Sequence, residues 1–436
     1  MNMTFQPRIS LSSTLLVSLL VSLLFSGFIK NFLSLPSLSL GAVLVDLFIA
    51  LQVVHTVLVL VFHYQAQNKL DRTYLLLALF WCILLLFTLA KLSLVDANPI
   101  REKVLGLRNN LIYCFPMFYL PLLLQKENQV RKSLSLLLAI GLFLCLFGIF
   151  QFTFASRLPL SLLVLDGESA FKFYDQAITR PTALLGNTII FASFTLLLFC
   201  LLFTKYLAQP KKTYLFYLAL VLITNVLTYT RASLAGFLLC SIAILLLHYG
   251  RFTVEYLLKL VVGLMVTLTL LLSIGYHYRD SFIIKRLTGR EASTQYSNEG
   301  HFSMIENALL YLQDHPLAGS GVGSQGPGAT AENVIIPDGY WFQLLLENGI
   351  LLGLLYLAFY LLCFVYVLLV FQKTQSVFLK QLCLTFIGIS VYYYAASFIN
   401  SAFIGRVNFI LYWVMFGLVM AQHLIIKKQQ NALPRH

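Results

Sequence analysis

Hydrophobic residues run along most of this chain in long blocks, separated by short polar connections. Twelve of these blocks reach the ~20 residues that an α-helix needs to cross a bilayer. They lie near residues 11–29, 38–62, 73–95, 104–124, 133–154, 183–204, 213–229, 233–249, 255–275, 345–371, 377–399 and 407–426. The pattern therefore predicts an all-α, polytopic membrane protein with about 12 transmembrane helices.

One polar stretch, beginning at Tyr276, is much longer than the others and interrupts this pattern. It divides the chain into residues 1–275 with helices 1–9, a large loop at 276–344, and residues 345–436 with helices 10–12 and a short tail. We therefore expect the loop between helices 9 and 10 to carry most of the chemistry.

The loop contains one segment with a helical pattern. Ser303 and Glu306 have the spacing of a capping box, and apolar residues recur at helical period from Phe302 to Leu312. His315-Pro316 then ends the pattern, because the residue before a proline avoids the helical conformation. This predicts one short amphipathic helix on the outer membrane face or across the mouth of a cavity.

Composition agrees with a membrane protein and narrows its function. Hydrophobic residues make up 59% of the chain and charged residues 11%, against about a quarter charged in soluble proteins. All seven cysteines fall inside apolar segments without CxxC spacing, which excludes a disulfide framework and zinc chemistry. No DxD pair lies in an outer connection, so we expect no metal cofactor.

The net charge of +13 is explained by the distribution of basic residues between the two sides of the membrane. With the amino terminus inside, the inner connections hold sixteen Lys and Arg, and the outer ones apart from the long loop hold eight. Short loops rich in Lys and Arg stay cytoplasmic. We therefore predict that both termini are cytoplasmic, that the large loop faces outward, and that the partner is the lipid bilayer and no nucleic acid.

Two arginines lie at predicted outer helix ends. Arg180 precedes Pro181, which suits a first helical turn. It is either an interfacial anchor or an anion ligand at a helix amino terminus, where the dipole adds to its charge. Arg231 lies in a tight outer turn between two long apolar helices. An unpaired guanidinium with little water around it is costly, which favours an anionic partner.

The end of the loop offers two further features. Gly319, Gly321 and Gly323 form a glycine-rich run that is neither a Walker loop nor a dinucleotide fingerprint. It is either a flexible hinge or a place where backbone approaches a substrate. Asp338 precedes Gly339 at the start of the next apolar block, where it is either a helix N-cap or a general base. We expect Gly349 to stop or kink the helix that begins there.

An acidic residue also lies inside the second predicted span. Asp46 is surrounded by apolar sequence, and an acid in a membrane helix is a functional candidate. It is equally compatible with a neutral side chain that is hydrogen-bonded to a neighbouring helix. Arg108 lies near the outer end of the fourth predicted span.

Together these motifs resemble the O-antigen ligase and O-antigen polymerase superfamily of bacterial envelope enzymes. The resemblance extends over nearly the whole chain and includes the large outer loop between helices 9 and 10. The motifs in chain order are Arg180 with Gly186-Asn187, Thr-Arg-Ala-Ser around Arg231, Thr-Gly-Arg ending at Arg290, Pro316 to Gly323, and Leu-Glu-Asn-Gly-Ile-Leu-Leu-Gly at 346–353.

The resemblance implies a membrane glycosyltransferase of the bacterial inner membrane. Its substrate would be a glycan on undecaprenyl diphosphate, transferred with inversion and without a metal to a hydroxyl of an acceptor glycan or glycolipid. Arg180, Arg231 and Arg290 would bind the diphosphate. Ligases of the family carry a histidine where this chain has Asp338, so Glu332, His315 and His301 remain rival bases.

Three functions stay open on the sequence. Asp338 in place of the ligase histidine favours polymerisation of an O-antigen or capsule-like polysaccharide. The alternative within the family is an O-antigen ligase that uses lipid A core as acceptor. A polytopic solute transporter is an alternative of another class, although the chain has no internal repeat and its charges lie at helix ends, away from the membrane midplane.

Overall fold

The computed structural model describes residues 9–32, 40–65, 71–163, 180–250, 292–326, 339–400 and 405–432, with isolated residues 273, 276, 277, 279, 285, 329, 335 and 403 between them. Every regular element in this part of the chain is helical, and none is a strand. The described elements are α1 (Ile9–Leu24), α2 (Ser26–Phe32), α3 (Leu40–Gln65), α4 (Arg72–Leu94), α5 (Ile100–Asn110), η1 (Ile112–Cys114), α6 (Pro116–Leu123), α7 (Glu127–Phe154), η2 (Ala155–Arg157), α8 (Leu160–Leu163), α9 (Thr188–Ala208), α10 (Lys212–Leu227), α11 (Arg231–Tyr249), α14 (Ala292–Asp314), α15 (Tyr340–Lys373), α16 (Val377–Ala396) and α17 (Arg406–Ala432).

The predicted all-α, polytopic membrane fold is confirmed. Within the described residues, eight helices are long and apolar enough to cross a membrane, or nine if the bent pair α1 and α2 counts as one span. The predicted count of twelve is not confirmed, and the predicted span at 255–275 lies outside the described residues. Helices dominate because lipid offers no partner to backbone N–H and C=O groups, which an α-helix pairs internally.

Helix α17 lies at the centre of the bundle. An apolar stretch of α17 is 83% buried inside the protein, against 28% for α3 and 22% for α4. It packs against α6, α16, α7, α9 and α15. Large apolar side chains on all sides, from Phe409 to Phe416, explain this position, since a helix that is apolar all round is stable only when enclosed.

Two helical segments are broken, and the first break falls inside a span that the sequence predicted as one continuous helix. The span predicted at 104–124 divides into α5, η1 and α6, with the break at Leu111. The indole N–H of Trp81 donates to the carbonyl of Leu111 at 3.3 Å. It thereby satisfies a backbone carbonyl that lies at the break. Pro116 then begins α6 at a position that tolerates its missing N–H.

The second break lies near the start of α15, at Gly349. This glycine has a φ of 73°, which divides α15 into a short first part and a long second part. Segment 316–320 supplies hydrogen-bond partners for the backbone groups at this break. The N–H of Ile350 donates to the carbonyl of Pro316 at 2.8 Å, and the carbonyl of Leu346 accepts from the N–H of Ser320 at 2.7 Å. The prediction that Gly349 stops or kinks the helix is confirmed.

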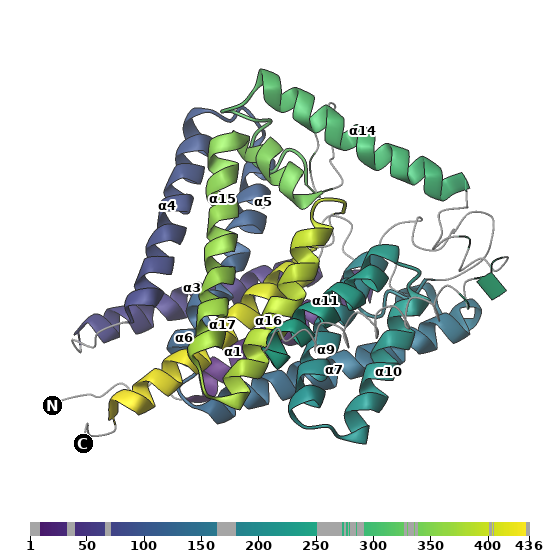
Figure 1. Cartoon of the computed structure of the whole chain (residues 1–436). Coiled ribbons are helices and arrows are strands. Elements are labelled where there is room, and N and C mark those ends of the chain that lie inside the picture. Colours follow the sequence, from purple (N-terminus) through teal and green to yellow (C-terminus); the bar gives the residue numbers. More distant parts are fainter. Residues whose placement is uncertain are drawn as a thin grey trace.

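The helix predicted inside the large loop exists, but it begins earlier in the sequence than predicted. Helix α14 already begins at Ala292, so Ser303 lies within it and its hydroxyl donates to the carbonyl of Gly300. Leu312 packs in a small apolar cluster with Ala308 and Leu346 of α15, whereas Phe302 is 73% exposed. Figure 1 shows α14 lying across one end of the molecule, with α1 beginning and α17 ending toward the other end.

Candidate functional site

Arg180 lies against the turn that joins α10 to α11. Its Nε donates to the main-chain carbonyl of Thr228 at 2.8 Å, and one terminal nitrogen donates to the hydroxyl of Thr230 at 3.1 Å. The sequence expectation placed Arg180 at the start of the sixth helix, which is wrong, since α9 begins only at Thr188. Arg180 instead lies next to the amino terminus of α11, whose N-cap is Thr230.

The turn itself has a constrained backbone. Tyr229 has a φ of 52°, which is unusual for a residue other than glycine, and its ring is largely buried. Burial raises the pKa of the Tyr229 hydroxyl. Arg231 follows directly as the first residue of α11, where the positive end of the helix dipole disfavours a cation. Arg180 and Arg231 are thus brought to the same turn.

Buried hydrogen bonds fix this turn to α9. The amide nitrogen of Asn225 donates to the carbonyl of Ala192 at 2.9 Å and to the hydroxyl of Thr195 at 2.7 Å. Its oxygen accepts from the hydroxyl of Ser233 at 3.0 Å. Asn225 and Ser233 have no exposed surface. Ser233, in the Thr-Arg-Ala-Ser motif, therefore positions the first turn of α11, and Arg231 with it.

Segment 180–187 is held from the other side by Gln151 of α7. The Gln151 side chain donates to the carbonyl of Ala183 at 2.8 Å and accepts from the N–H of Thr182 at 3.2 Å. Asn187 then caps α9 by accepting from the N–H groups of Ile189 and Ile190. Pro181 was expected in the first turn of this helix, but it lies in the non-helical approach to it.

The glycine-rich run is packed against the protein itself. A Cβ on Gly323 would lie 2.1 Å from the carbonyl oxygen of Glu102, and one on Gly321 would lie 2.2 Å from the side chain of Asn98. A Cβ on Gly319 would lie 2.3 Å from the carbonyl oxygen of Leu346. All three glycines have positive φ. Their conformation and close approach to α5 and α15 account for glycine here, and these contacts contradict the flexible hinge.

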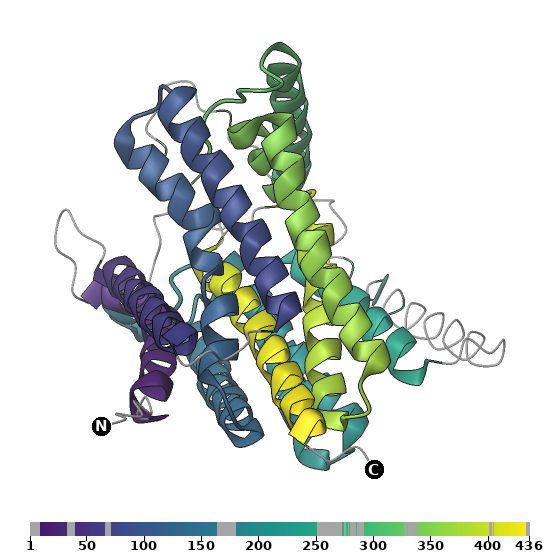
Figure 2. The ribbon, with the colours of Figure 1, turned by 90° about the vertical axis from the view of Figure 1, so that its left-hand side faces the viewer.

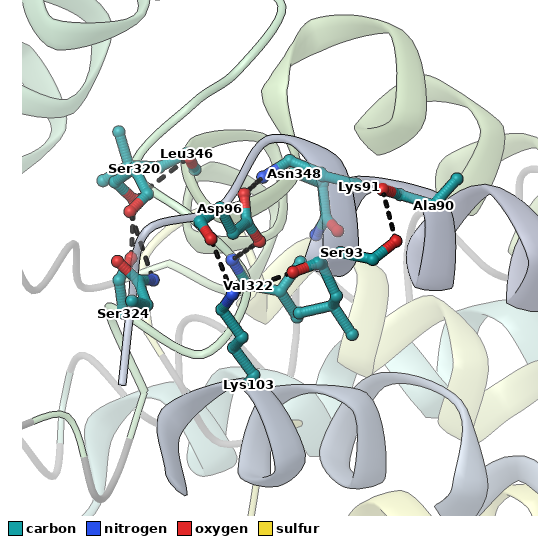
Figure 3. A network of polar contacts seen from close by, with 12 residues as sticks. Ala90, Lys91, Ser93, Asp96, Lys103, Ser320, Val322, Ser324, Leu346 and Asn348 are labelled. Carbon is teal, nitrogen blue, oxygen red and sulfur yellow. Dashed lines mark hydrogen bonds and ion pairs between the residues drawn. The ribbon is translucent and has the colours of Figure 1, made fainter. Parts of the chain in front are cut away.

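A buried ion pair holds this run on one side. Asp96, between α4 and α5, pairs with Lys91, and its carboxylate accepts from the N–H of Val322 at 2.9 Å. The two charged side chains are only 2% and 7% exposed. Lys103 donates to the main-chain carbonyls of Leu92 at 2.8 Å and Asp96 at 2.6 Å. Figure 3 shows Asp96 and Lys103 beside Val322, with Ser320 and Ser324 bonded to each other.

Glu347 holds the run on the other side. It lies just before the break in α15 and is 2% exposed. Its carboxylate accepts from the N–H of Gln325 at 3.3 Å and from the side-chain amides of Gln343 at 2.9 Å and Asn110 at 3.2 Å. Segment 319–325 is therefore fixed between α5 and α15 by two buried carboxylates.

Residues 216–357 match the family model of the O-antigen ligase. No curated protein matches the chain. The match supports the resemblance to the O-antigen ligase and polymerase superfamily, and with it a membrane glycosyltransferase-like role in O-antigen processing. It includes Arg231 and segment 319–325, whereas Arg180 lies before it.

The predicted bases are only partly described. His315 lies at the exposed end of α14, and the centroid of its ring is 4.7 Å from that of the Tyr311 ring. Asp338, Glu332 and Arg290 lie outside the described residues, as does the side chain of His301. The N-cap position of α15 is occupied by Gly339. The expectation that Asp338 caps this helix is therefore wrong.

Two charged residues of this region, Asp96 and Glu347, were missed as site candidates by the sequence reasoning. Both lie at the ends of apolar blocks, and nothing in the sequence indicates that they contact segment 319–325. In the described residues, no three His, Cys, Asp or Glu side chains are grouped so that they could hold a metal ion.

Proposed function

We propose that this protein transfers a glycan from undecaprenyl diphosphate to a sugar hydroxyl at the outer face of the bacterial inner membrane. The observation that carries the proposal is the placement of Arg180 against the turn that presents Arg231. A planar guanidinium can donate two parallel hydrogen bonds to a phosphate, which makes it suited to a diphosphate leaving group.

In this reaction the acceptor oxygen attacks the anomeric carbon from the side opposite to the diphosphate. The new C–O bond forms as the bond to the diphosphate oxygen breaks, which inverts the anomeric centre. Negative charge develops on the departing diphosphate, and Arg180 and Arg231 stabilise it. A carboxylate or imidazole takes the proton of the acceptor hydroxyl. Our first candidate for this base is Asp338, followed by Glu332 and His315.

Arg290 and the glycine-rich run have supporting roles in this proposal. Arg290 is a further diphosphate ligand by the resemblance alone. Segment 319–325 is fixed by Asp96 and Glu347, so we propose that it forms a rigid wall beside the substrate. None of these steps uses a metal ion. The chain's own arginines supply the positive charge that a metal would otherwise provide.

Polymerisation and ligation differ only in the acceptor. A polymerase adds the glycan to another lipid-linked repeat unit, whereas a ligase adds it to lipid A core. Asp338 in place of a histidine favours the polymerase, and the family matched by residues 216–357 favours the ligase as the second candidate. We propose a polymerase, because Asp338, the residue that departs from the ligase pattern, is the candidate base itself.

The test is glycan transfer in proteoliposomes that contain the purified protein and a lipid-linked glycan. Arg180→Ala and Arg231→Ala should each lower the transfer rate by at least ~100-fold, the usual cost of losing a group that stabilises developing charge. Lipid-linked repeat units and lipid A core, offered separately, distinguish polymerase from ligase. Full transfer by both alanine variants would refute the mechanism, and solute uptake without transfer would identify a transporter.

A further inference from the structure

Helices α7, α9 and α16 meet at the end of the bundle opposite to α14. The hydroxyl of Thr204 in α9 lies 3.0 Å from that of Thr385 in α16. Phe378 lies two turns before Thr385 on the same face of α16, since residues i and i+7 share a helix face. The guanidinium of Arg131 in α7 stands over the Phe378 ring, 3.9 Å from its centroid. In Figure 2 the end of α17 (yellow) and the turn from α9 to α10 (teal) both lie at this lower end of the molecule.

Lys205 brings a second positive charge to this corner. It directly follows Thr204 in the last turn of α9 and is half-buried. The charge that acts on its amine is that of Arg131, which is also positive. Among the residues that the structure describes, no carboxylate pairs with Lys205. Two neighbouring like charges, one of them half-buried, cost free energy unless an anion lies with them.

The carboxylate beside Arg131 is already engaged. One oxygen of Glu127 accepts from Nε and from a terminal nitrogen of Arg131, at 2.8 and 2.6 Å. The other oxygen accepts from the side-chain amide of Gln422 in α17 at 2.8 Å. The Arg131 side chain is still 51% exposed in spite of this pair, so part of its guanidinium can meet a ligand. Glu127 thus balances one of the two cations, and the charge of Lys205 is uncompensated.

The place of Lys205 along α9 puts it at the edge of the hydrocarbon. Helix α9 is long and apolar enough to cross a membrane, and Lys205 lies in its last turn. Helix α10 packs against α9 and begins at Lys212. Its first two turns already expose Leu215 and Phe216, by 48% and 67%, as expected of side chains that face lipid chains. Phospholipid headgroups therefore lie level with this end of α9.

We propose that Lys205 and Arg131 bind the phosphate of an anionic phospholipid, on the side of the membrane that the sequence predicts to be cytoplasmic. One phosphate diester supplies the single negative charge that this corner lacks, through charge-assisted hydrogen bonds. A lipid fits better than a free phosphate, because its acyl chains cover the exposed apolar surface of α10. Basic pockets between transmembrane helices are suited to such headgroups. The whole of α9 separates Lys205 from the segment of Arg180, so this inference does not depend on the proposed function.

The test compares two lysines of one connection. Lys205→Gln and Lys212→Gln each remove one basic residue near the turn from α9 to α10, so their effects on topology are matched. Lys212 is exposed and is the control. The purified protein in detergent is titrated with phosphatidylglycerol, and bound lipid is counted by native mass spectrometry. Affinity should fall by about 10-fold in Lys205→Gln, as expected for a lost charge-assisted hydrogen bond, and stay unchanged in Lys212→Gln. Phosphatidylcholine, which has no net charge, should bind weakly to all three proteins.

Further variants and ligands identify the source of the phosphate. Lys205→Arg keeps the charge and should bind phosphatidylglycerol as the wild type does. Lys205→Met keeps an apolar stem in the half-buried position and gives the same comparison if Lys205→Gln does not fold. Inorganic phosphate and glycerol 3-phosphate carry the anion without acyl chains and should leave the thermal midpoint unchanged, whereas phosphatidylglycerol should raise it. An equal rise with the soluble anions would overturn the lipid assignment. Equal phosphatidylglycerol affinity in Lys205→Gln and Lys212→Gln would overturn the site itself.

Discussion

The Nε of Arg180 donates to the main-chain carbonyl of Thr228 at 2.8 Å, across 48 positions of the chain. This contact joins the segment before α9 to the turn before α11. It gives Arg180 a defined orientation next to Arg231, which begins α11. An arginine already oriented by a neighbouring turn loses less conformational entropy when it binds a phosphate.

Arg180→Lys tests this orientation. A lysine has a single nitrogen at its tip and cannot contact both the Thr228 carbonyl and the Thr230 hydroxyl in the same planar geometry while facing a phosphate. We expect the glycan transfer rate to fall by about 100-fold with unchanged protein yield. Arg157→Lys, on the exposed helix η2, is the control and should be active. Equal rates in the two variants would contradict the role of the planar group.

Gly323→Ala tests whether the glycine-rich run is a packed wall. A Cβ would collide with the carbonyl of Glu102, and the φ of 82° is unfavourable for alanine. We expect a loss of about 1–3 kcal/mol in the free energy of unfolding, measured by thermal unfolding in detergent. Gly300→Ala in α14 has nothing within 4 Å of its Cβ and should be neutral or stabilising. A stable Gly323→Ala protein would restore the hinge hypothesis.

Asp338 is tested by paired substitutions. A general base needs a carboxylate, so Asp338→Asn should slow glycan transfer by about 10²–10⁴-fold. Asp338→His supplies an imidazole at the same position and should keep part of the activity. Asp314→Asn, at the exposed end of α14, is the control for loss of a carboxylate elsewhere in the large loop. Wild-type polymer length and rate in Asp338→Asn would shift the role of base to Glu332 or His315.

The outward orientation of the large loop is tested with a cysteine at Gln313. This residue is exposed on α14, so a label can reach it. Six native cysteines are buried and Cys82 is exposed, so a Cys82→Ala background suffices. An impermeant maleimide should label Gln313→Cys in intact spheroplasts. Labelling only after permeabilisation would invert the predicted topology.

Much of the fold could be predicted from the sequence, because long apolar blocks have few alternatives in lipid. The helices around residues 40–65, 127–154 and 377–396 follow from composition over ~20 residues, since each backbone group must find its partner within its own segment. The position of a tight turn is also a local property. The sequence placed Arg231 in the turn between two helices, and the structure has it directly after that turn, as the first residue of α11.

Contacts between distant parts of the chain were decided only by the tertiary structure. The breaks at Leu111 and Gly349 are stable because Trp81 and Pro316 take the released backbone groups, and neither partner is near in sequence to its break. Asp96 reaches Val322 across 226 positions. Hydropathy over a short window measures how apolar a segment is, but it carries no information about which distant side chain meets a given backbone group. The packing of the helices therefore decided that segment 319–325 is fixed between α5 and α15.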